Sequence, residues 1–233
     1  MENIRFDFSD FHRYGRAFYE FLQLRKKVFV DALNWDVPHN DSVEMDQYDT
    51  PLAHYSLVLR DGVVVGGART MATSSVWGEH TYMLGDAYSG KLPYIPRHVL
   101  SVDIASPAVW ECTRLVIDDC LTSQAERSEC LTLIVDGLVE MARAKGATTL
   151  ISLSPLPFMR AMRQVGYEVS LLGQAYRSGE DGRQYGVMKM PAEYSTLWKL
   201  RNQPSSVVTS ITVKRPVPVV PAYSQINLPE AVA

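Results

Sequence analysis

The 233-residue sequence contains no long run of basic residues, and its formal net charge of −3 comes from 23 basic and 26 acidic side chains. A nucleic-acid footprint or a polybasic membrane patch needs such a run, so neither partner is expected. The N-terminus lacks the charged start, apolar centre and cleavage site of a signal peptide, and no apolar run approaches the length of about 20 residues that spans a bilayer. We therefore expect a cytoplasmic protein with a small-molecule or protein partner.

Cysteine is also scarce. Cys112, Cys120 and Cys130 are odd in number and form no CxxC spacing, which argues against a disulfide framework and against a closed zinc site. The sequence also has no GxSxG elbow, no GxGxxG after a strand and no GxxxxGK(S/T) loop, which disfavours a Ser-His-Asp hydrolase, a dinucleotide site and a phosphate-cradling loop. The enzymes that remain are those that move an acyl group with carboxylates and backbone donors.

The pattern of apolar and turn residues predicts one mixed α/β domain over residues 1–195. The N-terminal half is expected to form a helical segment over 11–33, an antiparallel strand pair over 53–71 that turns at Asp61-Gly62, and a surface excursion over 72–106 with one short helix. Strands and helices are then expected to alternate: a strand over 108–118, a helix over 124–145, a strand over 148–154, a short helix over 157–165 and a strand over 167–172. A final hairpin is expected over 172–190. Helices are expected on both faces of the sheet. A Pro-rich tail over 196–233 is expected to be extended or disordered.

The stretch SVEMDQYDTP places Glu44, Asp46 and Asp49 within six residues. Carboxylates this close repel one another, so the chain needs solvent, a metal or a docked cation to offset the repulsion. The central glycine and distal glutamate of a calcium-binding EF-hand loop are missing at the required offsets, which disfavours a calcium site. A solvated loop with one capping aspartate is the plainest interpretation of the stretch taken alone.

Two arginines nearby favour a different interpretation. Arg25 shares a predicted helical face with Leu22 and Phe29, whereas an arginine with no partner normally turns toward water. Arg69 follows two glycines in GGARTM, and glycine allows a backbone or a ligand to approach closely. Taken singly, each arginine is more typical of a surface or salt-bridge residue than of a catalytic one.

The strand WECTRLV carries a third arginine. Because successive strand side chains alternate between faces, Glu111 and Thr113 are predicted to point one way while Cys112 and Arg114 point the other, unless a β-bulge interrupts the strand.

Together, these segments resemble a known family. The ordered set LRKKVFVDALNWD, EMDQYDTPLAHY, VGGARTM, WECTRLVI and MRAMRQVGY is similar to the acyl-homoserine-lactone synthases, the autoinducer synthases of bacterial quorum sensing. The family's signature residues fall on Arg25, Phe29, Trp35, Asp46, Asp49, Arg69, Glu111 and Arg114. Tyr88, in GDAYSG, is the counterpart of a family phenylalanine that precedes a proline. Glu44 has no assigned counterpart, and we interpret it as a solvated neighbour of the two aspartates.

The resemblance implies a fold similar to GNAT acetyltransferases, with a mostly antiparallel central sheet, helices on both faces and a splayed central strand pair that admits an acyl thioester. It implies two substrates, S-adenosylmethionine and an acyl group carried by acyl carrier protein or coenzyme A, with no separate cofactor and no metal. The α-amine of S-adenosylmethionine attacks the thioester, and its carboxylate then displaces methylthioadenosine to close the lactone.

The implied catalytic residues are Glu111, Arg114 and Arg69, with Glu111 as the base that accepts the amine proton, directly or through a water. S-adenosylmethionine brings two cations and a carboxylate, which suit acidic, aromatic and arginine side chains. The implied substrate-binding residues are Arg25, Phe29, Trp35, Asp46, Asp49, Ser152 and Ser154. Asp46 and Asp49 are expected to be electrostatic anchors, and the two serines either bond an oxygen on the third acyl carbon or simply face the sheet and cap the next helix.

Two alternatives stay open. An ordinary GNAT N-acyltransferase would use acyl-coenzyme A, but the segment LTSQAERSEC at the start of the central helix has none of the glycines that let a backbone approach a pyrophosphate. The second alternative is a non-catalytic sensor that binds an acyl ligand, which would have no need for Glu111 as a base.

Overall fold

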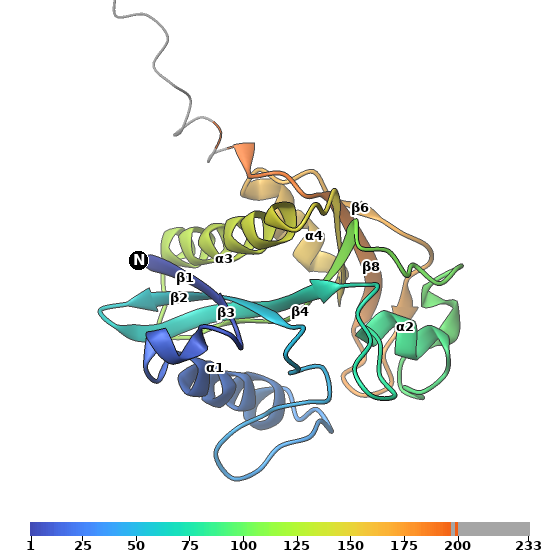
Figure 1. The fold of residues 1–233 in the computed structure, drawn as a ribbon, viewed down its shortest axis with the longest axis horizontal. Coiled ribbons are helices and arrows are strands. Elements are labelled where there is room, and N and C mark those ends of the chain that lie inside the picture. Colours follow the sequence, from blue (N-terminus) through green and yellow to red (C-terminus); the bar gives the residue numbers. More distant parts are fainter. Residues whose placement is uncertain (197–198, 200–233) are drawn as a thin grey trace, which may run out of the picture. The chain divides into compact units, whose positions relative to one another are not determined.

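The computed structural model describes residues 1–196 and 199, which form a sheet with helices on both faces (Figure 1). The eight strands are β1 (Glu2–Asp7), β2 (His54–Arg60), β3 (Val63–Ala72), β4 (Val109–Ile117), β5 (Thr149–Pro155), β6 (Ser170–Leu171), β7 (Tyr176–Arg177) and β8 (Gln184–Pro191). Their order in the sheet is β1-β2-β3-β4-β5-β8-β6, with β7 also paired to β8. Only β4 and β5 pair in parallel, so the expectation of a mostly antiparallel sheet is confirmed.

The helical elements are η1 (Phe11–Tyr14), α1 (Ala17–Arg25), η2 (Lys26–Ala32), α2 (Met83–Tyr88), η3 (Arg97–Val99), α3 (Gln124–Ala144) and α4 (Leu156–Gln164). The π-helix η2 continues α1 without a break, so the helical segment expected over 11–33 is one short turn followed by a joined pair. The strand expected over 167–172 is reduced to the two residues of β6. Except for residues 196 and 199, the expected tail over 196–233 lies outside the described residues.

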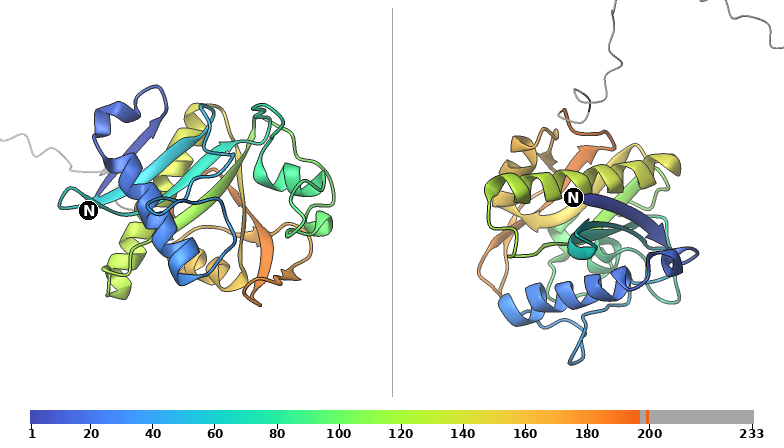
Figure 2. Two further views of the ribbon diagram at one scale, coloured as in Figure 1. Left: turned by 90° about the horizontal axis from the view of Figure 1, so that it is seen from below. Right: turned by 90° about the vertical axis from the view of Figure 1, so that its left-hand side faces the viewer.

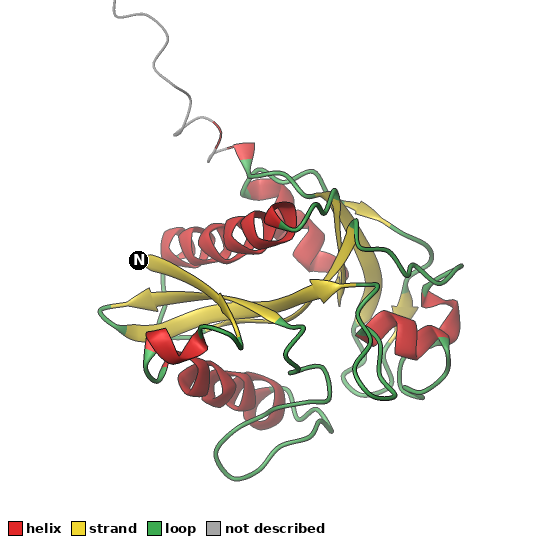
Figure 3. Ribbon diagram, in the orientation of Figure 1, coloured by secondary structure: helices red, strands yellow, loops and turns green. Residues whose placement is uncertain are grey.

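The helices form two layers, with α1 on one face of the sheet and α3 and α4 on the other (Figures 1 and 3). Strand side chains alternate between faces, so neighbouring residues of β3 pack in different hydrophobic clusters. Val64 belongs to the cluster between the sheet and α1, and Val65 belongs to the cluster between the sheet and α3. The excursion that carries α2 lies at one end of the sheet, beyond α1 (Figures 1 and 2).

The two glycines of β3 allow both helical layers to approach the sheet. A Cβ atom at Gly66 would lie 2.6 Å from the Cys130 sulfur of α3, and one at Gly67 would lie 2.9 Å from the Phe21 ring of α1. Helix side chains therefore approach both glycines closely, and the Leu57 side chain of β2 also approaches Gly67.

The central strands β4 and β5 separate after a short paired segment. Their parallel ladder runs only from Val109↔Thr149 to Glu111↔Ile151, although β4 continues to Ile117 and β5 to Pro155. Beyond Glu111, β4 stays paired with β3 while β5 stays paired with β8. The sheet therefore opens at Glu111, as a splayed strand pair requires.

Candidate active site

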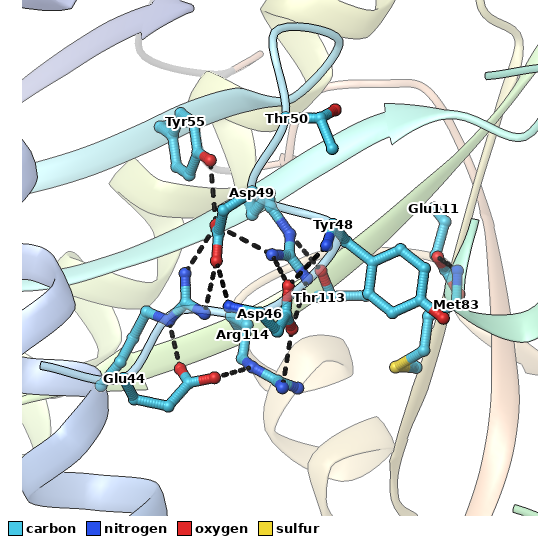
Figure 4. Close-up of polar contacts among 12 residues, drawn as sticks. Glu44, Asp46, Tyr48, Asp49, Thr50, Tyr55, Met83, Glu111, Thr113 and Arg114 are labelled. Carbon is cyan, nitrogen blue, oxygen red and sulfur yellow. Dashed lines mark hydrogen bonds and ion pairs between the residues drawn. The ribbon is translucent and has the colours of Figure 1, made fainter. Parts of the chain in front are cut away.

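Three arginines and three carboxylates, distant in sequence, form one buried network beside the splay (Figure 4). Arg25, in the last turn of α1, is fully buried. Its Nε donates to Glu44 Oε2 at 2.5 Å, and its two terminal nitrogens donate to the Asp49 carboxylate at 2.8 and 2.9 Å. This paired geometry fixes the acidic loop against the helix.

Arg69 of β3 makes the second set of contacts and is also fully buried. Its Nη1 and Nη2 donate to the two oxygens of Asp46 at 2.5 and 3.1 Å, and its Nε donates to the Thr113 hydroxyl at 3.1 Å. The same Nη1 lies 2.8 Å from Asp49 Oδ1. Arg69 therefore joins both aspartates to the centre of the sheet.

Arg114 of β4 completes the network. Its Nε donates to Glu44 Oε1 at 3.1 Å, and its Nη2 lies 2.7 Å from Asp46 Oδ2. Arg114 and Thr113 do not point to opposite faces, because both contact the Arg69–Asp46 cluster; the exception made for a bulge applies here. The cause is local: the β3–β4 register shifts between Gly67 and Arg69, and Arg114 has a φ of 55°, so strict alternation fails at this residue.

Glu44 is the functional residue that sequence reasoning missed. Interpreting it as a solvated neighbour is wrong, because its side chain has no exposed surface and bridges Arg25 and Arg114. The spacing of the acidic loop alone does not distinguish it from an exposed glutamate. Only the contacts across 19 and 70 residues of sequence do so.

The arginines keep the aspartates ionised. Burial acts to raise the pKa of Asp46, but the Arg69 and Arg114 guanidiniums outweigh it and hold the pKa well below its ordinary value. The pKa of Asp49 is likewise lowered, by Arg69 and Arg25 against burial. Neither aspartate is suited to carry a proton near neutral pH.

Glu111 differs from these carboxylates because it faces no arginine at hydrogen-bonding distance. It is 2% exposed, and its two oxygens accept the backbone N–H groups of Met83 at 2.8 Å and Leu84 at 2.9 Å. Burial raises the pKa of Glu111 to about 7, against the two N–H bonds, which lower it. A carboxyl group with this pKa exchanges a proton near neutral pH, which is what a general base requires.

A cavity of about 630 Å³ extends from the splay. At one end it is lined by Phe29, Trp35 and Arg114, and the deeper part lies between the sheet, α3 and α4. The Phe29 and Trp35 rings stack with centroids 5.0 Å apart, and the Arg114 guanidinium lies 5.4 Å from the Phe29 ring centre. Aromatic faces beside a guanidinium suit a ligand that carries both cationic and anionic groups.

The deeper part of the cavity is mostly apolar. Its lining residues from α3, α4, β5 and β8 include Leu131, Val135, Leu138, Leu150, Met162, Met188 and Met190. Ser152 and Ser154 also line it, and their hydroxyl oxygens lie 3.1 Å apart.

Not every predicted site residue lines the cavity. Arg25, Asp46, Asp49, Arg69 and Glu111 are not among the residues that line it, whereas Phe29, Trp35, Arg114, Ser152 and Ser154 are. Tyr88 is 37% exposed at the end of α2 and does not line the cavity either.

Comparisons with known proteins identify the family. The sequence profile described as "Autoinducer synthase" matches residues 10–196. The chain belongs to the autoinducer synthase family. The acyl-homoserine-lactone synthase of Acinetobacter nosocomialis is 33% identical over 168 residues, which are 69% of this chain and 81% of that protein. The synthase of Aeromonas salmonicida is 32% identical over 163 residues, 66% of this chain and 70% of that protein. Like these relatives, the chain is an acyltransferase.

Solved structures share the fold. The synthase TofI, in a ternary complex with an inhibitor and MTA, superposes with a TM-score of 0.67 at 24% identity, covering 88% of this chain and 98% of that one. The CoA-dependent acyl-homoserine lactone synthase BjaI, with SAM and isopentyl-CoA, superposes with a TM-score of 0.65 at 18% identity, covering 81% and 82% of the two chains. At these identities the likeness concerns the fold.

Two further features bear on partners. Within residues 1–196 and 199, no helix is both long and apolar enough to cross a membrane. The same residues hold no group of three or more histidine, cysteine or acidic side chains placed to bind a metal ion.

Proposed function

We propose that the protein acylates the α-amine of S-adenosylmethionine from an acyl thioester and then closes the homoserine lactone, releasing methylthioadenosine. The observation that carries this proposal is the position of Glu111, a buried carboxyl group with a pKa of about 7, at the residue where the central strands part. The names of the relatives support the same reaction.

The chemistry begins with the ammonium group of S-adenosylmethionine, which must lose a proton before it can attack. Glu111 accepts that proton, directly or through a water. The amine nitrogen then bonds to the thioester carbonyl carbon, and the carbon–sulfur bond of the thioester breaks as the carrier thiol leaves with a proton. The backbone N–H groups at the splay are suited to stabilise the intermediate oxyanion.

Lactone closure needs no further proton transfer. A carboxylate oxygen of the acylated S-adenosylmethionine attacks the γ-carbon, and the bond between that carbon and the sulfonium sulfur breaks. Methylthioadenosine leaves as a neutral thioether, because the sulfonium takes up the electron pair while the carboxylate loses its charge. The positive leaving group and the internal nucleophile supply the driving force, so the protein's task is to hold the chain in a folded conformation.

Arg114 is the arginine best placed for the substrate carboxylate, since it lines the cavity and its side chain is 11% exposed. Phe29 and Trp35 then supply faces for the sulfonium and the adenosine. We assign Arg25 and Arg69 an indirect role: they hold the acidic loop, and the loop carboxylates orient Arg114.

The deeper apolar part of the cavity suits the acyl chain, because burying each methylene contributes about 0.8 kcal/mol. Ser152 and Ser154 are the polar groups on its wall, and either hydroxyl can bond an oxygen at the third acyl carbon.

Acyl carrier protein is our proposed donor, because a capping box already satisfies two backbone donors at the start of α3. The Ser123 hydroxyl accepts the Glu126 N–H at 3.2 Å, and the Glu126 carboxylate accepts the Ser123 N–H at 3.2 Å. A pyrophosphate at this helix end would therefore meet an acidic side chain where GNAT enzymes need free N–H groups.

The test is to incubate the purified full chain with S-adenosylmethionine and matched sets of acyl carrier protein and coenzyme A thioesters. Mass spectrometry then identifies lactones, and methylthioadenosine release gives the rate. We expect both products with at least one acyl carrier protein thioester. Release with coenzyme A thioesters alone would show that the donor is wrong, and absence of methylthioadenosine with every donor would refute the synthase proposal.

A further inference from the structure

Asp86 of α2 is a buried carboxylate with an unusual number of donors. Its side chain has no exposed surface. Oδ1 accepts the Thr81 N–H at 3.1 Å, the Thr81 hydroxyl at 2.8 Å and the Lys91 ammonium at 3.3 Å. Oδ2 accepts the Tyr48 hydroxyl at 3.0 Å and lies 2.9 Å from His80 Nδ1. Burial opposes ionisation of this group, yet the hydrogen bonds hold the pKa of Asp86 below its ordinary value.

These contacts join two segments that flank the reaction site. Tyr48 lies between Asp46 and Asp49 in the acidic loop, and its side chain extends from the arginine network in the direction of Met83 and Glu111 (Figure 4). Its ring also lies under the Arg69 guanidinium, 5.7 Å from ring centre to Cζ. Asp86 therefore connects α2 to the loop that holds the arginines.

The first turn of α2 is also where Glu111 is held. Tyr82, the residue before the helix, makes no capping hydrogen bond with its side chain, and the first two helical N–H groups, those of Met83 and Leu84, donate to the Glu111 carboxylate. Because Asp86 fixes Thr81 just before this turn, it sets where those two N–H groups point.

We propose that Asp86 is a positioning residue for Glu111: it fixes the first turn of α2 against Tyr48 so that the Met83 and Leu84 N–H groups hold the Glu111 carboxylate in place. This inference rests on the proposed role of Glu111 as the base. It adds that the acidic loop, through Tyr48 and Asp86, controls the base as well as the arginines.

Other charged and titratable groups act on Glu111, and Asp86→Asn leaves all of them in place. Arg69 lowers its pKa, and Asp46 raises it. Tyr48 of the acidic loop, Tyr82 before α2 and Cys112 on the same strand also interact electrostatically with Glu111. Asp86 is not among the charges that act on it most strongly, so replacing Asp86 should affect Glu111 through the two N–H groups.

The experiment is an NMR titration of the ¹⁵N-labelled full chain, following the Met83 and Leu84 amide signals from about pH 5 to 9. In the parent protein both signals should shift with a midpoint near 7, and Glu111→Gln should abolish that shift. In Asp86→Asn we expect the midpoint to rise by about one unit, because weakening N–H bonds to the carboxylate favours its protonated form. Exchange of the two amide hydrogens should accelerate about tenfold or more.

Asp136→Asn is the matched control, since Asp136 is also a buried acid, accepts the Tyr167 hydroxyl at 2.8 Å and lies on α3, away from α2. It should lower stability without moving the midpoint. Tyr48→Phe, which removes a single donor to Asp86, should move the midpoint in the same direction by less, and it carries the test if Asp86→Asn fails to fold. An unchanged midpoint and exchange rate in folded Asp86→Asn would overturn the inference. If Asp86→Asn does not fold, the same result in Tyr48→Phe would overturn it. An equal shift of the midpoint in Asp136→Asn would also overturn it.

The pH dependence of kcat separates this inference from the proposed function. If Glu111 is the base, the acid limb of kcat in Asp86→Asn should move upward together with the amide midpoint, with KM for S-adenosylmethionine changed less than about twofold. If the midpoint of the amide titration moves while the acid limb of the kcat–pH profile stays in place, the positioning role is upheld and Glu111 is rejected as the base.

Discussion

Replacing Glu44 by Gln removes one negative charge from the buried network while keeping the size of the side chain. The network holds three guanidiniums, those of Arg25, Arg69 and Arg114, and three carboxylates, those of Glu44, Asp46 and Asp49. Their formal charges sum to zero. The variant leaves one uncompensated positive charge in a region where Arg25 and Arg69 have no exposed surface.

The expected cost follows from that imbalance. Breaking a buried ion pair by removing one partner costs about 3–5 kcal/mol, because the other charge is left without compensation. The Gln side chain keeps one oxygen that can accept from Arg25, so we expect a loss near the lower end, about 3 kcal/mol. For a domain of this size that loss lowers Tm by about 6–12 °C.

The assay is urea unfolding followed by circular dichroism, with thermal melts as a second measurement. Glu44→Gln combined with Arg114→Met restores a neutral set of two arginines and two aspartates. The double variant should therefore be about 1–3 kcal/mol more stable than the sum of the two single changes predicts. A loss below about 1 kcal/mol for Glu44→Gln, or additive effects in the double variant, would refute the reasoning that charge balance stabilises this region.

Three other outcomes are expected. Because Glu111 must be ionised to accept a proton, kcat should fall as pH drops below about 7. Glu111→Gln should lower kcat by about 10²–10⁴-fold with little change in KM. Full turnover in the Glu111→Gln variant would exclude Glu111 as the base. Leu138→Phe should reduce kcat/KM for the longest accepted acyl chain by about tenfold or more, by filling the deep cavity, as checked by mass spectrometry of the products against a shorter donor. Burial raises the pKa of Cys112 and of Cys130 to about 12, so a thiol reagent near neutral pH should label one cysteine, the exposed Cys120, in the native chain and all three after denaturation.

Several elements were predictable because their causes are local. The turn at Asp61-Gly62 was expected from its residue types, and both residues have positive φ values, 54° and 80°. The helix over 124–145 was expected from its apolar period and the glycine after it, and α3 ends at Ala144, with Gly146 at a φ of 85°. In each case the conformation depends on residues within one turn of the chain.

The arginine–carboxylate pairs could not be predicted from local sequence. The cluster in the acidic loop left solvent, a metal and a docked cation open, and its neighbours in sequence do not show which partner each carboxylate takes. Arg114 reaches Glu44 across 70 residues only because the strand is irregular at that residue. Regular alternation fails at Arg114 for the same reason.

The sequence by itself therefore determined the order of the main elements after β1, the family and, apart from Glu44, the charged residues that lie together. Hydrophobic period, turn chemistry and residue identity are encoded along the chain, which is why these features were visible without coordinates. The tertiary structure decided the pairing: it buried Glu44, brought Arg114 to the face of Thr113 and joined Asp86 to Tyr48 and to the turn that holds Glu111. Such contacts depend on strand register and on how an excursion packs back on the sheet, and both are set by the whole fold.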